Sequence, residues 1–164
     1  MNRRIENMLA YILDKKHHAY RQDIDEKKIQ EFTESLSRQQ LPDMERAKQR
    51  LAWVLEHEVP VILPGEKIAF TRTVRQIPEI FTRAEWDKIK KSHYIHELGS
   101  VCNISSNYIE TIEKGFDQRR TEIKEAIQRQ SAEGDAEGVK FLEAVLKSVD
   151  DVQQLADRYA LKAM

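Results

Sequence analysis

The residues with the most chemical potential gather in one short stretch of the chain. His93 and His96 come just before Cys102, the single cysteine, and two serines and a tyrosine follow. Thiol, imidazole and hydroxyl groups at such close spacing could form a metal site or a nucleophilic centre. Each kind of site requires further residues nearby, and the neighbouring sequence shows whether they are present.

A metal site needs more ligands than the stretch supplies. His93 and His96 would share one helix face, but Zn²⁺ takes four ligands, or three and a water. Cys102 lies beyond a glycine loop, and neither His-Glu pair (57–58 and 96–97) has a histidine three residues after its glutamate, as the zinc-protease motif requires. The pattern favours ordinary polar or packing histidines, so a small metal-dependent enzyme built on these residues ranks last.

A nucleophilic cysteine would need a deprotonated thiol, held by a paired histidine or a helix N-terminus. Val101 and Ile104 instead predict apolar surroundings for Cys102, which favours a structural thiol. Ser105 and Ser106 fit the turn and cap that open the next helix. The residues themselves therefore predict no catalytic, cofactor-binding or metal-binding side chain, and the role of Cys102 stays open.

Composition narrows the class of protein. The 164 residues fit one domain, with 40% hydrophobic and 34% charged residues. The 27 basic and 28 acidic residues leave a net charge of −1, which gives no electrostatic footprint for nucleic acid or an anionic membrane. There is no apolar run of about 18 residues and no apolar N-terminal signal. A lone cysteine favours the reducing cytoplasm.

Apolar residues recur at helical spacing along most of the chain, which predicts a mainly α, bundle-like fold. The predicted helices carry Ile5, Met8, Leu9, Ile12 and Leu13; Ile24, Ile29, Phe32 and Leu36; Met44, Ala47, Leu51, Val54 and Leu55; Trp86 and Ile89; Ile109, Ile112, Phe116, Ile123 and Ile127; and Val139, Leu142, Val145, Leu146, Val149, Val152, Ala156 and Tyr159.

Boundary signals frame these helices. Pro42 fits the first turn of the third helix, which fades near His57. The sequence from Thr82 to Glu85 is a capping box, in which a threonine and a glutamate three residues later satisfy free N–H groups at a helix start. Ser106 or Asn107 would cap the fifth helix, and Gly134-Asp135 separates it from the last.

Residues 59–73 have a different character and predict a short β-hairpin or extended arm. Two β-rich runs flank Pro64-Gly65, and Pro60 confines the first run to a sheet edge. A lone two-stranded hairpin is marginally stable, so this arm should lean on other structure.

The last helix, roughly 136–162, has an unusually broad apolar stripe. Phe141 and Leu155 widen it beyond what one flanking helix would cover, and no Gly, Asn or Pro stop signal follows. We expect a single α-rich domain over 1–164, with a helical lead-in at 1–40, that is part of a larger protein. Exposed apolar stripes also favour self-association of the isolated chain.

Several sequence blocks, read in order, resemble a known superfamily. They are Asp-Met-Glu-Arg-Ala-Lys-Gln-Arg-Leu-Ala from 43, Val-Pro-Val-Ile-Leu-Pro-Gly-Glu-Lys-Ile from 59, Ile-Pro-Glu-Ile-Phe-Thr from 77, His-Tyr-Ile-His-Glu-Leu-Gly from 93, Asn-Ile-Ser-Ser-Asn-Tyr from 103 and Glu-Lys-Gly-Phe-Asp from 113. The series resembles the N-terminal region of glycyl radical enzymes over about residues 43–160. It resembles the dehydratase and decarboxylase branch, which is called pyruvate formate-lyase-like, more than pyruvate formate-lyase itself. The chain departs from the family pattern at Ser106-Asn107-Tyr108, where family members commonly have Pro-Asp-Tyr.

The resemblance implies a parent several times longer, folded around a ten-stranded α/β barrel. An activating enzyme that uses S-adenosylmethionine and an iron–sulfur cluster would create a radical on a backbone glycine. The radical would pass to a cysteine, which attacks a small organic substrate in anaerobic lyase or transferase chemistry.

Neither reactive residue of that family maps onto this chain. The radical glycine follows Arg-Val-Ser or Arg-Val-Ala, and none of the chain's glycines does: Gly65, Gly99, Gly115, Gly134 and Gly138. Cys102 follows valine, whereas the family's thiyl cysteine follows glycine. The resemblance thus implies an N-terminal structural portion that is inactive alone, with the rest of the parent enzyme as its partner. The alternative is a free-standing helical interaction or regulatory module.

Overall fold

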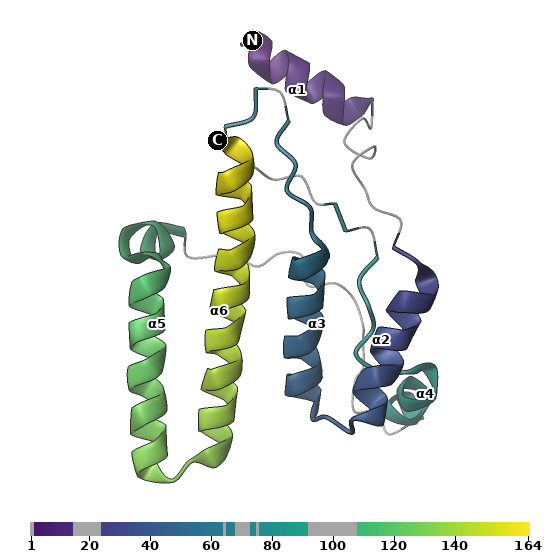
Figure 1. The fold of residues 1–164 in the computed structure, drawn as a ribbon, viewed down its shortest axis with the longest axis vertical. Coiled ribbons are helices and arrows are strands. Elements are labelled where there is room, and N and C mark those ends of the chain that lie inside the picture. The colour runs from purple at the N-terminus through teal and green to yellow at the C-terminus, as the bar shows by residue number, and fades with distance from the viewer. Residues whose placement is uncertain (1, 15–23, 64, 68–72, 75, 92–107) are drawn as a thin grey trace.

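The computed structural model describes residues 2–14, 24–63, 65–67, 73–74, 76–91 and 108–164. Over these ranges the chain is mainly helical, which confirms the predicted helical class (Figure 1). The helices are α1 (Arg3–Leu13), α2 (Glu26–Arg38), α3 (Asp43–His57), α4 (Arg83–Lys91), α5 (Tyr108–Glu133) and α6 (Ala136–Ala163).

Local signals explain where these helices begin. The carboxylate of Asp25 accepts the Lys27 N–H at 3.0 Å at the start of α2, and that of Asp135 accepts the Gly138 N–H at 2.9 Å at the start of α6. Pro42 stands immediately before α3, one position earlier than predicted, where its missing N–H is equally harmless. The predicted break at Gly134 is confirmed, with a positive φ of 77° that suits glycine.

Helix α6 lies between α5 and α3, and all three run side by side (Figure 1). On the α5 side, the Arg120 guanidinium donates to Asp150 at 2.6 Å and to the Gln153 amide oxygen at 2.7 Å. On the α3 side, Ala144 is buried. The width of the predicted apolar stripe therefore comes in part from two neighbours within the chain, although Phe141 stays 55% exposed.

The predicted fifth helix is bent rather than continuous. Gly115 within α5 has φ 67° and ψ −177°, values that side-chain-bearing residues avoid. The turns before it carry Ile109 and Ile112, which are 71% and 81% exposed. The bend separates these apolar residues from the part of α5 that packs on α6.

An arginine from α6 closes the C-terminus of α3. The Arg158 guanidinium donates to the carbonyl oxygens of Glu56 at 3.1 Å and Glu58 at 2.9 Å, and also to that of Leu55. Carbonyls in the last turn lack intrahelical partners and carry partial negative charge, so a cation there is stabilising. This contact ties α6 to the point where the chain leaves α3.

Side chains hold together the two ends of the predicted hairpin. The Glu58 carboxylate, almost fully buried, accepts hydrogen bonds from the Thr73 N–H and hydroxyl, and the Val59 N–H donates to the Thr73 hydroxyl at 2.8 Å. The described part of 59–73 contains no strand. Residues 64 and 68–72 lie outside the described residues.

The apolar core is small and centres on α2, α3 and the segments that follow α3 and precede α4. Its buried apolar side chains among the described residues are Leu36, Val54, Leu63, Val74, Phe81 and Ala144. Helix α1 contacts this body at its edge, where Arg4 donates to the Gly65 carbonyl at 3.0 Å. Four of its apolar residues are 45% or more exposed: Ile5, Leu9, Ile12 and Leu13.

Candidate functional site

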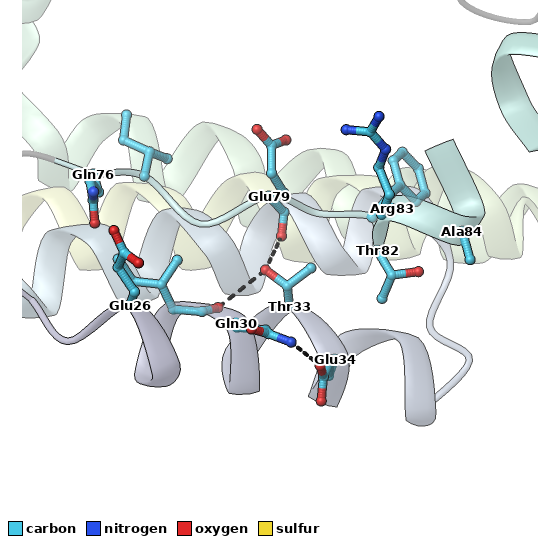
Figure 2. Close-up of a pocket in the computed structure, with 12 residues that line it drawn as sticks. Glu26, Gln30, Thr33, Glu34, Gln76, Glu79, Thr82, Arg83 and Ala84 are labelled. Carbon is cyan, nitrogen blue, oxygen red and sulfur yellow. Dashed lines mark hydrogen bonds between the residues drawn. The ribbon is translucent and has the colours of Figure 1, made fainter. Parts of the chain in front are cut away.

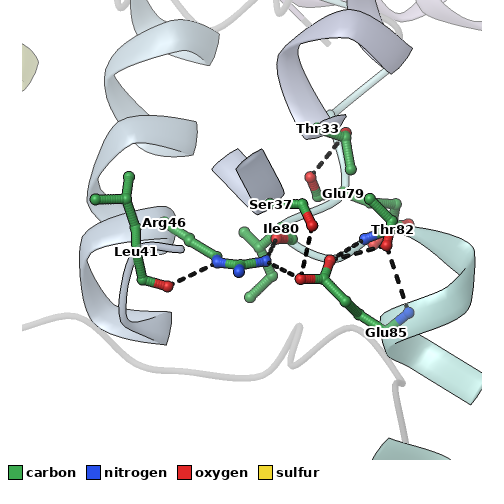
Figure 3. A network of polar contacts seen from close by, with 8 residues as sticks. All are labelled: Thr33, Ser37, Leu41, Arg46, Glu79, Ile80, Thr82 and Glu85. Atoms are coloured by element: carbon green, nitrogen blue, oxygen red, sulfur yellow. Dashed lines mark hydrogen bonds and ion pairs between the residues drawn. The ribbon is translucent and has the colours of Figure 1, made fainter. Parts of the chain in front are cut away.

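A polar cluster around Arg46 and Glu85 joins α2, α3 and α4 (Figure 3). Arg46 projects from α3 and is only 7% exposed, and its Nη1 lies 2.9 Å from the Glu85 carboxylate. Its remaining hydrogen bonds go to the carbonyl oxygens of Leu41 at 2.8 Å and Ile80 at 3.2 Å. A buried guanidinium needs acceptors of this kind, because an unpaired buried charge is costly.

Glu85 is also the glutamate of the predicted capping box, which the structure confirms. One of its carboxylate oxygens accepts the Thr82 N–H at 2.7 Å and the Thr82 hydroxyl at 2.9 Å. The Glu85 N–H reaches back to the Thr82 hydroxyl at 3.4 Å. The second carboxylate oxygen takes Arg46 and, at 2.9 Å, the Ser37 hydroxyl from α2. One carboxylate thus starts α4 and anchors it to two other helices.

These contacts keep Glu85 ionised. Partial burial opposes its charge, but the hydrogen bonds from Thr82, Arg46 and Ser37 outweigh that cost and lower the pKa of Glu85 to about 2. The group is therefore a permanent anion near neutral pH. Its partners neutralise it, so its position suits structural support rather than acid–base catalysis.

Aromatic packing fixes the segment that leads into α4. Phe81 is 6% exposed and meets Trp86 edge to face, with ring centroids 4.9 Å apart. The Arg46 guanidinium carbon lies 5.4 Å from the centroid of the Phe81 ring, within reach of a cation–π contact. The same arginine therefore holds both the backbone and a side chain of this segment.

Beside this support lies a groove of about 600 Å³ between α2 and the 76–84 segment (Figure 2). Its back wall is fixed by the buried Thr33 hydroxyl, 2.9 Å from the Glu79 carbonyl oxygen. Its large apolar lining residues are Ile29, Ile77 and Phe81, of which Ile77 is 53% exposed and Phe81 only 6%. An exposed apolar side chain that lines a groove is surface that a bound group could cover.

The groove has an acidic surround. Glu26, Glu34 and Glu79 contribute carboxylates, and among the described lining residues Arg83 is the only cation. Arg83 lies 3.8 Å from Asp87 on the next turn of α4. Across the described residues, the carboxylates of Glu26 and Glu79 have no hydrogen-bond or ion-pair partner. Glu34 differs from these two, because it lies 3.6 Å from Arg38 and accepts a hydrogen bond from Gln30. Over the described residues, the groove therefore combines apolar lining with the negative charge of Glu26 and Glu79.

The stretch that suggested chemistry in the sequence cannot be placed. His93, His96 and Cys102, with the candidate caps Ser106 and Asn107, lie outside the described residues. In the described ranges no group of three or more acidic, histidine or cysteine side chains is arranged to hold a metal ion. His57 lies within them and packs in α3: its ring stacks on Trp53 at 3.9 Å and Nδ1 lies 2.8 Å from the Trp53 carbonyl oxygen.

Sequence reasoning found the cap role of Glu85 but missed its second partner. Arg46 is 39 residues away in sequence and has no local signal that marks it as buried. A capping-box glutamate uses one carboxylate oxygen within its own helix start. Its other oxygen is free to accept a hydrogen bond from elsewhere in the fold, and this was the only sequence signal for such a partner. The groove itself left no motif, since α2 and the 76–84 segment meet only in the folded chain.

Helices of the described ranges are too short or too polar to cross a membrane. Comparison with protein-family models, curated proteins and solved structures gave no match in any of the three. The groove and its Arg46–Glu85 support are therefore interpreted from their own geometry.

Proposed function

We propose that this chain is the N-terminal helical portion of an anaerobic glycyl radical enzyme of the pyruvate formate-lyase-like kind. The ordered blocks between residues 43 and 160 support the assignment, and they alone supply the chemistry. In the intact parent, which would cleave C–C or C–O bonds of a small organic substrate, this portion would pack around an α/β barrel. The predicted hairpin around Pro64-Gly65 would complete its pairing there.

The observation that best supports a packing role is the apolar surface left outside the chain's own core. Ile109 and Ile112 precede the bend of α5, Leu161 is 72% exposed near the end of α6, and Leu13 is 70% exposed on α1. A helical layer that covers a larger body needs such residues on its outer faces. In this proposal they contact the remainder of the parent.

The proposal assigns no radical chemistry to the chain. The radical glycine and the thiyl cysteine would belong to the remainder of the parent, and the activating enzyme would act there. We therefore expect no turnover by the chain alone.

The encoding gene provides the first test. We expect the reading frame to continue past Met164 into a barrel sequence with a Gly-Cys pair and an Arg-Val-x-Gly motif. A stop codon directly after Met164 would contradict the proposal. It would favour the alternative, a free-standing helical module whose exposed apolar residues bind a separate protein.

Electron paramagnetic resonance provides a second, independent test. The purified chain, mixed with the activating enzyme and reductant, should give no glycine-centred doublet, whereas the full-length parent treated in the same way should give one. A doublet from the chain alone would show that one of its own glycines carries the radical.

A further inference from the structure

We infer that the groove between α2 and the 76–84 segment is a docking site for a basic amphipathic peptide segment of a partner protein. In the complex, an apolar side chain of the segment fills the floor at Ile29, Ile77 and Phe81. Flanking lysine or arginine side chains pair with Glu26 and Glu79. This site goes beyond the proposed function and would stand if that proposal failed.

The shape of the groove selects a side chain rather than a flat surface. At about 600 Å³ it is an open recess with room for a side chain of a bound segment. Phe81 is held from behind by Trp86 and Arg46, and Thr33 fixes the main chain at Glu79. A preformed wall costs little ordering on binding, which favours a weak-to-moderate peptide site.

Charge selects the kind of segment. Within the part of the chain that the structure describes, the carboxylates of Glu26 and Glu79 have no ion-pair or hydrogen-bond partner, so a cation from a bound segment could pair with either one. Anionic partners would be repelled from the same surface. A segment with an apolar side chain between basic residues would contact the apolar floor and pair with the surrounding carboxylates at the same time.

Arg46 and Glu85 would support the site from behind without touching the peptide. Their contacts, drawn in Figure 3, hold α2, α3 and the 78–82 segment together. Substitutions that test binding should therefore spare them and change only exposed groove residues.

The test begins with a library of random 12-residue peptides displayed on phage. The library is selected on the wild-type chain and depleted on a chain carrying Ile77→Ser and Glu79→Gln. We expect the surviving peptides to share an apolar residue flanked by lysine or arginine. Survivors that are acidic, or no enrichment over the depleted pool, would overturn the inference.

Fluorescence anisotropy then measures binding of the consensus peptide to variants of the chain. The variants distinguish the contribution of the apolar residues from that of the carboxylates. Glu26→Gln with Glu79→Gln should weaken binding about fivefold at low ionic strength, and added salt should reduce that difference. Ile77→Ser should weaken binding about tenfold at any salt concentration. The matched control is Glu125→Gln with Glu133→Gln, an equal charge change on exposed positions of α5.

The control must bind like the wild type for the inference to hold. If the control pair weakened peptide binding as much as the groove pair, the net charge of the chain would explain the effect. That result would overturn the assignment of the binding site to the groove. Sedimentation of the wild-type chain with and without the peptide tests the other occupant, a second copy of the chain. A dimer that the peptide dissociates would also overturn the inference, because the natural occupant would then be the chain itself.

Discussion

Glu85 is the residue on which the packing of α4 depends most. Its carboxylate serves the capping box with one oxygen and takes Arg46 and Ser37 with the other. The hydrogen bonds that lower its pKa also stabilise the fold, because a group that ionises more easily in the folded chain favours folding when it is charged.

The sign of the pH dependence follows from the direction of that shift. The pKa of Glu85 falls from 4.5 to about 2, so its contribution is present above about pH 4.5 and is lost as pH falls toward 2. A shift of this size corresponds to on the order of 3 kcal/mol. Glu85→Gln should lower the free energy of unfolding near neutral pH by about that amount and flatten its decline between pH 4.5 and 2.

Urea unfolding followed by circular dichroism across this pH range measures the effect. The control is Glu79→Gln, because the Glu79 carboxylate has no partner among the described residues. If Glu85→Gln and Glu79→Gln had the same pH profile as the wild type, the coupling of Glu85 to Arg46 would be refuted.

At the scale of elements, the bend of α5 depends on one glycine. Gly115 has φ 67° and ψ −177°, and a Cβ added there would meet nothing within 4 Å. Gly115→Ala should therefore act through backbone strain alone and lower the free energy of unfolding by about 1–3 kcal/mol. Thermal unfolding measures this, with Lys124→Ala, at an exposed site of the same helix, as the control. An unchanged or raised midpoint would mean that the bend is not required.

The junction of α3 and α6 depends on Arg158. Its guanidinium reaches three carbonyl oxygens at the end of α3 through two nitrogen atoms of one rigid plane, whereas a lysine ammonium would have to donate from a single nitrogen at the end of a flexible side chain. Arg158→Lys should lower the free energy of unfolding by about 1–3 kcal/mol, and Arg158→Ala by at least as much. Chemical denaturation compares both with the wild type. If the lysine variant matched the wild type, the charge alone would account for the contact and the hydrogen bonds would add nothing.

At the scale of the whole molecule, the described residues form a small core and leave several large apolar side chains exposed. Helix α6 packs against both α5 and α3, yet the first turns of α5 and much of α1 leave apolar side chains exposed. Exposed apolar side chains of this kind favour association. The described fold is consistent with the helical class that the sequence predicted, and the barrel parent remains a proposal.

Exposed apolar surface predicts self-association of the isolated chain. Ile109 and Ile112 are three residues apart and share one helix face before the bend. Replacing both with serine should shift the chain toward monomer in sedimentation velocity at high protein concentration. Serine at Lys124 and Glu125, exposed polar positions of the same helix, should not. A wild-type chain that sediments as a monomer at every concentration would contradict this prediction.

The sequence alone determined the helices and several of their boundaries, because helical periodicity, the capping box at Thr82 and the break at Gly134 act within a few residues. It could not determine that α6 lies between α5 and α3, nor that Gly115 bends α5, since a lone glycine within a helical pattern is compatible with either outcome. The partnership of Arg46 with Glu85, the cap that Arg158 supplies to α3 and the acidic groove beside α2 join residues distant in sequence. Only tertiary packing decides which of many available charged side chains meet, because pairing energy depends on distance and burial that no local pattern encodes.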